Sequence, residues 1–202
     1  MDNNKIEIKK PIDEFSDSQR FGGYSFLPKS FKWPVNSNNE KLILVFSIPA
    51  IFLNKYCNSN LDKDKWLSVF STYNDDYFLD EVIDNGDVFD EFEKIFGDFT
   101  QVILHDKGEA RNESDNIIPS HLIEVFSDTS KNVNMENSKL GGYPTYLQNE
   151  VKETKNMSFC FQFYTGYLPI FQNILFLDDA ICYLFISNIN EEFNGIFFGQ
   201  CT

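Results

Sequence analysis

The chain has 202 residues, enough for one large domain or two small ones. Hydrophobic residues make up 42% of it, which excludes a wholly disordered protein. Acidic residues outnumber basic ones by 31 to 17, for a net charge of −14, so we expect neither nucleic acid nor an anionic membrane surface as a partner, but a basic protein.

The first third of the chain predicts turns followed by buried strands. Residues 1–20 are polar and are expected to form a loosely packed lead-in; they lack the apolar segment of a signal peptide, which favours a cytoplasmic protein. Paired glycines and prolines predict turns over 21–34. The apolar run 41–48 predicts a strand, and Pro49 suits the start of a short helix over 50–57. A further strand is predicted over 66–72, with Trp66, Val69 and Phe70 inward.

Residues 74–98 form an acidic block with ten carboxylates and one lysine, which accounts for −9 of the net charge. Phe89, Phe92 and Phe96 recur at helical spacing, which predicts an amphipathic helix over 87–96 with an acidic outer face. The block is either a solvated face or a docking surface for a basic protein, in which carboxylates speed association and aromatic residues anchor the complex. The predicted partner-binding residues are Asp75, Asp76, Tyr77, Phe78, Asp80, Glu81, Asp84, Asp90, Glu91 and Glu93.

The rest of the chain is dominated by predicted strands. Two are expected over 99–105 and 121–126, separated by a polar loop over 106–120 and followed by a long loop over 127–138. Met157, Phe159, Phe161 and Phe163 alternate with smaller or more polar residues, which predicts a strand with these four side chains on one face. Further strands are predicted over 174–177, 180–187 and 195–200, with turns at 178–179 and 188–194. Their close succession indicates an antiparallel meander. The predicted fold is therefore α+β, a mainly antiparallel β-sheet with a few peripheral helices.

A short motif occurs twice. Phe21-Gly22-Gly23-Tyr24 resembles Leu140-Gly141-Gly142-Tyr143, and each copy precedes a predicted strand. The repeat predicts a single domain over 21–202 built from two related halves, at about 21–130 and 139–202. A glycine turn that is merely used twice would give the same pattern, because glycine pairs allow positive φ.

The order of several motifs resembles that of the YwqG-like family of bacterial cytosolic proteins of unknown function. The motifs are FGGYSFLPKSFKWP, LILVFSIPA, LGGYPTYLQ, FCFQFY, LDDAICYLFIS and EEFNGIFFGQCT. The resemblance covers roughly residues 19–201 and is poor between about 56 and 135. Ser47 stands where the family strand has glutamine, and Ser25 where the first proline belongs. Some family members are encoded beside secreted polymorphic toxins, which implies by association an immunity role.

Residues suited to catalysis are few. His105 and Asp106 are neighbours on a predicted strand, so their side chains point to opposite faces, and His121 is expected at the surface or a strand edge. Cys57, Cys160, Cys182 and Cys201 are too far apart in sequence for a metal motif and are expected as free thiols; three of them lie in apolar, strand-like segments, where burial is expected. We therefore predict no catalytic residue, no metal site and no cofactor.

Two glutamines are candidates for a polar pocket. Tyr143, Gln148 and Gln162 would form a possible pocket in the second half; the favoured alternative is that the glutamines, with Gln200, bond to neighbouring backbone inside the core. Three functions stay open. The first is a non-enzymatic immunity protein that binds and blocks a cognate toxin domain. The second is a small-molecule-binding protein, and the third is an enzyme of unrecognised type.

Overall fold

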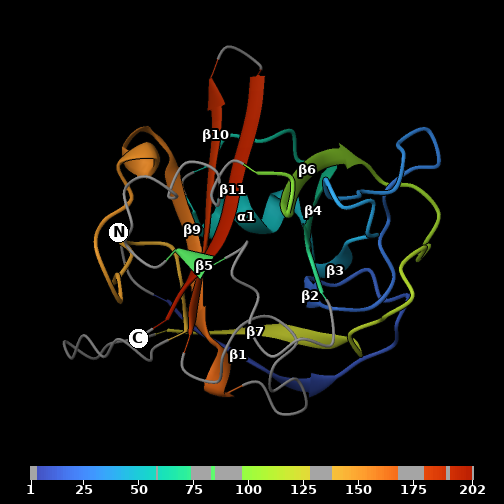
Figure 1. Ribbon diagram of the computed structural model, residues 1–202. Helices are drawn as coiled ribbons and strands as arrows, with labels where there is room; N and C mark the ends of the chain where they lie inside the picture. The colour runs from blue at the N-terminus through green and yellow to red at the C-terminus, as the bar shows by residue number, and fades with distance from the viewer. Residues whose placement is uncertain are drawn as a thin grey trace.

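The computed structural model describes residues 4–57, 59–73, 83–84, 97–127, 138–167, 180–189 and 192–201. Within these ranges the protein is α+β and mainly antiparallel, as predicted, with one 11-stranded sheet (Figure 1). The first-half strands are β1 (Asn4–Pro11), β2 (Arg20–Phe21), β3 (Ile43–Pro49), β4 (Lys65–Ser71), β5 (Ile83–Asp84) and β6 (Thr100–Asp106). The others are β7 (His121–Ser127), β8 (Lys139–Leu140), β9 (Ser158–Tyr164), β10 (Ile181–Ile189) and β11 (Glu192–Gln200). The helical elements are α1 (Ala50–Tyr56) and the 3₁₀ turns η2 (Lys152–Asn156) and η3 (Thr165–Tyr167).

The sheet curls until its two ends meet. Its strand order is β5-β11-β10-β9-β8-β1-β7-β2-β3-β4-β6, and only the pairing of β5 with β11 is parallel. The hydroxyl of Thr100 on β6 donates to the carbonyl of Phe197 on β11 over 2.7 Å. A Cβ added at Gly195 on β11 would lie 2.4 Å from a methyl carbon of Val102 on β6, so the two strands are closely packed there. The sheet is therefore nearly closed into a barrel, whose strands surround the interior in Figure 1.

The two halves share their backbone geometry in detail. Strands β2-β3-β4-β6 correspond to β8-β9-β10-β11, and both glycine pairs have positive φ, at 69° and 80° in the first and 71° and 72° in the second. The Gly22 N–H donates to the Val45 carbonyl over 2.8 Å, and the Gly141 N–H donates to the Cys160 carbonyl over 2.7 Å. Each accepting residue is the extra residue of a β-bulge, in β3 and β9 respectively. The repeated motif thus marks two related halves, as predicted.

The first strand of each half, β1 or β7, pairs with a strand of the other half. β1 pairs with β8 of the other half, β7 pairs with β2, and β1 and β7 pair with each other with Glu7 opposite Glu124. The equivalence therefore takes in β1 and β7, so that the related halves cover 4–106 and 121–200. The expectation of a loosely packed lead-in over 1–20 is wrong, because β1 lies in the middle of the sheet with Ile6 and Ile8 buried.

Three apolar clusters fill the fold. The largest lies inside the barrel, where the ring of Phe46 contacts the rings of Phe21, Phe161 and Phe163 at centroid distances of 4.6 to 5.4 Å. Two smaller clusters lie on the outer face of the sheet, one in each half, beneath the segments that follow the glycine pairs. Helix α1 packs against β3 and β4 and buries Ala50 and Leu53 in the inner cluster.

Most predicted elements are present with small shifts in their bounds. The strands predicted over 41–48, 66–72, 99–105, 121–126 and 180–187 correspond to β3, β4, β6, β7 and β10, and the helix after Pro49 is α1. The turn predicted over 188–194 is too long, because β10 and β11 stay paired as far as Ile189 and Glu192. The predicted helix over 87–96, the strand over 174–177, the turn at 178–179 and most of the loop over 127–138 lie outside the described residues.

Three predictions about individual side chains are wrong. Of Trp66, Val69 and Phe70, all predicted to point inward, only Val69 belongs to the inner cluster, and Phe70 belongs to the outer cluster of the first half, because successive side chains of a strand point to opposite faces. The bulge at Cys160 turns Phe159 to the outer face, where it packs on Phe185, whereas Phe161 and Phe163 face the interior. His121 is buried rather than at a surface or edge, because β7 has a strand on each side. The four cysteines are free thiols, as expected, and all four are buried, although burial was expected for three.

Candidate functional site

A groove lies on the outer face of the second half, and the segment 143–157 forms its wall. This segment leaves the sheet at Gly141-Gly142, whose left-handed backbone turns the chain over β9 and β10. Beneath it, the outer face carries three buried polar side chains that the sequence places on successive strands, namely Gln162, Tyr183 and Gln200.

These three side chains fix the segment by hydrogen bonds to its backbone. Gln162 accepts from the Thr145 N–H over 2.8 Å, and the Tyr183 hydroxyl accepts from the Leu147 N–H over 2.9 Å. Gln200 accepts from the Gln148 N–H over 3.2 Å and donates to the Asn149 carbonyl over 3.0 Å. The wall of the groove is therefore held in one conformation by groups that are themselves buried in the sheet.

The first half has a polar chain in the corresponding place, but with different residues. Ser68 and His105 stand where Tyr183 and Gln200 stand in the second half. The Ser68 hydroxyl lies 2.8 Å from His105 Nε2 and 3.1 Å from the Ser25 hydroxyl, which accepts from the Leu27 N–H. All of these side chains are fully buried, so the chain of hydroxyls and imidazole holds the backbone rather than facing a substrate.

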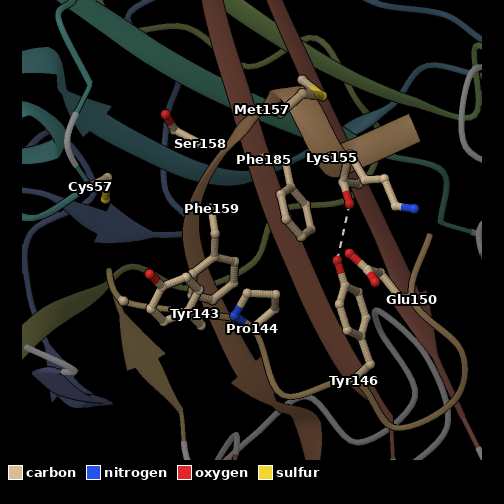
Figure 2. Close-up of a pocket in the computed structure, with 12 residues that line it drawn as sticks. Cys57, Tyr143, Pro144, Tyr146, Glu150, Lys155, Met157, Ser158, Phe159 and Phe185 are labelled. Carbon is tan, nitrogen blue, oxygen red and sulfur yellow. Dashed lines mark hydrogen bonds between the residues drawn. The ribbon is translucent and has the colours of Figure 1, made fainter. Parts of the chain in front are cut away.

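The groove has a volume of about 580 Å³, within the range of small-molecule pockets. Four of its lining residues are aromatic, and Figure 2 shows Phe159 and Phe185 between Tyr143 and Tyr146. Tyr143 is 78% exposed although it is a large aromatic residue. The remaining lining residues are Cys57, Gly142, Glu150, Thr154, Lys155, Met157 and Ser158.

The charged groups of the groove lie at its rim. Figure 2 shows the Glu150 carboxylate beside the hydroxyl of Tyr146, and the Lys155 amino group pointing away from the rings. The Tyr146 hydroxyl donates to Thr154 over 3.0 Å, and Thr154 in turn donates to the Val151 carbonyl over 2.7 Å. Burial, and to a lesser degree the negative charge of Glu150, raises the pKa of Tyr146, so this residue stays a neutral donor.

Three more titratable groups belong to this region: Cys57 lines the groove, and Cys160 and Lys139 are buried behind it. The Cys57 thiol donates to the Cys160 carbonyl over 3.3 Å, and burial raises the pKa of the neighbouring Cys160 thiol. Lys139 donates to the Thr145 hydroxyl over 2.7 Å, and burial lowers its pKa. These groups are committed to the protein's own structure, so the groove surface offers aromatic faces and a carboxylate rather than a reactive nucleophile.

The predicted pocket residues are not all in the groove. Tyr143 lines it, whereas Gln162 is buried behind the wall and Gln148 points to the end of β11, where its amide contacts the Cys201 carbonyl. The contacts of Gln162 and Gln200 match the structural interpretation of the glutamines. The predicted partner-binding residues Asp75, Asp76, Tyr77, Phe78, Asp80, Glu81, Asp90, Glu91 and Glu93 lie outside the described residues, and only the backbone of Asp84, in β5, is described.

Sequence reasoning missed most of the groove. Phe159 and Phe185 lie on predicted strands, and no pattern assigned Tyr146 or Glu150 to a site. One signal was present: the first half carries Trp33 between its glycine pair and its strand, and the second half has no tryptophan there.

Comparisons with known proteins do not identify the groove. No family model matches the chain, and no curated protein sequence matches it. Among the residues that the structure describes, there is no grouping of three or more histidine, cysteine, aspartate or glutamate side chains that could hold a metal ion. The same residues include no helix with the length and apolar character needed to span a membrane.

Proposed function

We propose that this chain is a non-enzymatic bacterial immunity protein, which binds a basic toxin domain in the cytoplasm and blocks it by covering its active surface. A protein of net charge −14 attracts positively charged partners and speeds their association. The resemblance to the YwqG-like family favours the same role, by association.

The observation that carries the proposal is the place where the acidic block joins the fold. Within the block, Ile83 and Asp84 pair in parallel with Gly199 and Gln200 at the end of β11, whereas Asp98 at its end accepts from the Ser37 hydroxyl in the first half. The side chain of Gln200 also holds the backbone of 148–149, directly before Glu150 at the rim of the groove. Part of the acidic block thus pairs with the strand whose Gln200 holds the wall of the groove, which supports the proposal that carboxylates and aromatic anchors serve one partner.

Co-expression with the toxin-domain gene expected beside this gene tests the proposal. The toxin alone should stop growth, and this chain should restore growth and co-purify with the toxin. Absence of both rescue and complex would overturn the proposal.

Charge reversal then locates the interface. Asp80→Lys with Glu81→Lys should slow association with the toxin and make it less sensitive to salt, because screened charges at an interface act mainly on the rate of encounter. The matched control is Asp64→Lys with Asp115→Lys, which makes the same change of charge at two exposed residues of the described surface. Equal effects of both pairs would show that only net charge matters, and not the acidic block.

A second candidate function, binding of a small molecule, is favoured by the groove itself. Its volume and its combination of aromatic rings with a few polar groups are typical of ligand pockets. The experiment in the next section separates this function from the first.

A further inference from the structure

We infer that the groove of the second half binds the indole ring of a tryptophan side chain presented by a partner protein. The inference rests on the proposed function only in taking a protein as the source of the ring. The shape of the site is argued from the first half of this chain.

In the first half, the corresponding site is filled. Trp33 packs in a cluster with Leu27, Leu42, Leu44 and Phe70, and it is only 6% exposed. Its ring meets Phe70 edge-to-face at a centroid distance of 5.2 Å, and its indole N–H donates to the Leu42 carbonyl over 2.9 Å. This side chain arrives on the segment 24–42, which covers the outer face of β3 and β4.

The strand registers show which residues of the second half are equivalent. Leu44 lies opposite Phe70 just past the first bulge, and Phe159 lies opposite Phe185 just past the second. Leu27 and Tyr146 each follow the second glycine of their pair by four residues. Leu42 directly precedes β3, and Met157 directly precedes β9.

The four buried residues clustered with Trp33 thus have counterparts that line the groove, namely Tyr146, Met157, Phe159 and Phe185, whereas Ile103 and Arg111, which also lie against the Trp33 cluster, have none. No lining residue of the groove is equivalent to Trp33. The second-half segment is shorter, with fifteen residues at 143–157 against nineteen at 24–42. It buries the smaller Val151 in the local cluster and leaves the groove open.

The chemistry of the groove suits the same ring. Phe185 offers an edge or face to an indole as Phe70 does, and Met157, at the position equivalent to Leu42, could accept the indole N–H with its carbonyl as Leu42 does. The exposed ring of Tyr143 can close over the bound ring, and a thioether such as that of Met157 packs well on an aromatic ring. A tryptophan within a chain segment is the favoured occupant because that is how the first half delivers its own.

The test uses the full chain with ¹³C-methyl-labelled methionine and N-acetyl-tryptophanamide as the probe. The chain has three methionines, Met1, Met135 and Met157, and Met157→Leu assigns the groove signal. The ring current of a bound indole should shift the Met157 methyl resonance in a saturable manner. N-acetyl-leucinamide, which has no ring, should produce no such shift.

Matched variants distinguish the groove from other surfaces. Tyr143→Ala should weaken binding of the amide roughly two- to tenfold, the value of one aromatic pair. Tyr24→Ala, at the equivalent position of the first half, should leave it unchanged. No saturable shift at the highest soluble concentration, or an equal effect of both variants, would overturn the inference.

Two further measurements test whether the bound ring comes from a protein or from a small molecule, and whether its binding depends on the acidic block. Free indole binding at least tenfold more tightly than the amide would show that the occupant is a small molecule, which overturns the assignment to a protein side chain. Asp80→Lys with Glu81→Lys should leave amide binding unchanged. A failure of the groove inference is therefore distinguishable from a failure of the proposed function.

Discussion

At the scale of single residues, His105 is the most informative side chain. Its Nδ1–H donates to the carbonyl of Asp106 over 2.7 Å, so its Nε2 is left as the acceptor for the Ser68 hydroxyl. This arrangement requires the neutral imidazole. Burial lowers the pKa of His105 below its usual 6.5, and the hydrogen bond to Asp106 opposes this only in part.

The depressed pKa of His105 predicts a pH dependence of stability. Below about pH 6.5 the unfolded chain binds a proton on this imidazole, whereas the folded protein does not until a lower pH. The free energy of unfolding should therefore fall as the pH is lowered from 7 to 5. His105→Gln, which introduces the residue found at the equivalent position Gln200, should reduce this fall.

Urea unfolding of both proteins at pH 7 and pH 5 checks the prediction. The comparison removes the contribution of the carboxylates, which are the same in both. An identical loss of stability in the two proteins would contradict it.

At the scale of elements, the segments that follow the glycine pairs determine whether the outer face of the sheet is covered or open to a ligand. In the first half, Trp33 seals this face, and in the second half the face stays partly open. Trp33→Ala should therefore destabilise the protein by about 3–5 kcal/mol and convert the first half to a second groove. Added indole should then raise the melting temperature of the variant, because it binds the folded state alone.

Thermal melts followed by circular dichroism provide the measurement. Phe31→Ala is the control, since Phe31 is 41% exposed and lies on the same segment. That variant should melt close to the wild type and should gain no more from indole than the wild type gains through the groove of the second half. A Trp33→Ala protein that indole stabilises no more than the wild type would show that the residues around Trp33 do not form an indole site.

The elements also show what the sequence could predict. Local patterns sufficed for β3, α1, β6 and β9, because their apolar spacing and the proline before α1 are local signals. The bulges at Val45 and Cys160 were not predictable, since each depends on a glycine N–H that reaches the carbonyl from a distant segment. The groove could not be predicted for a related reason. The sequence shows that the second half lacks a tryptophan at this point, but whether a groove results depends on how the shorter segment 143–157 packs.

At the scale of the whole molecule, the exchange of β1 and β7 ties the two halves together. Each half completes its sheet with a strand of the other, and Ile6 and Ile8 of β1 pack into the common inner cluster. Ile6→Asp should therefore abolish cooperative unfolding of the entire chain, because an unpaired carboxylate would be buried in the core.

A melting curve for the complete chain tests this. Lys9→Asp is the matched control, on the same strand but with its side chain 61% exposed. We expect it to shift the midpoint only slightly. Wild-type melting of Ile6→Asp would mean that β1 contributes little to the barrel.

The strand exchange also has a consequence during synthesis on the ribosome. β1 is made before both of its neighbours, and the second of them, β8, ends only at Leu140. At about 5–20 residues per second, roughly 130 further residues take on the order of ten seconds. For most of that time, until β7 ends at Ser127, β1 has no strand to pair with in its own chain, so nascent chains on one message are at risk of pairing with each other, and a chaperone that holds short extended segments would be needed most at this stage.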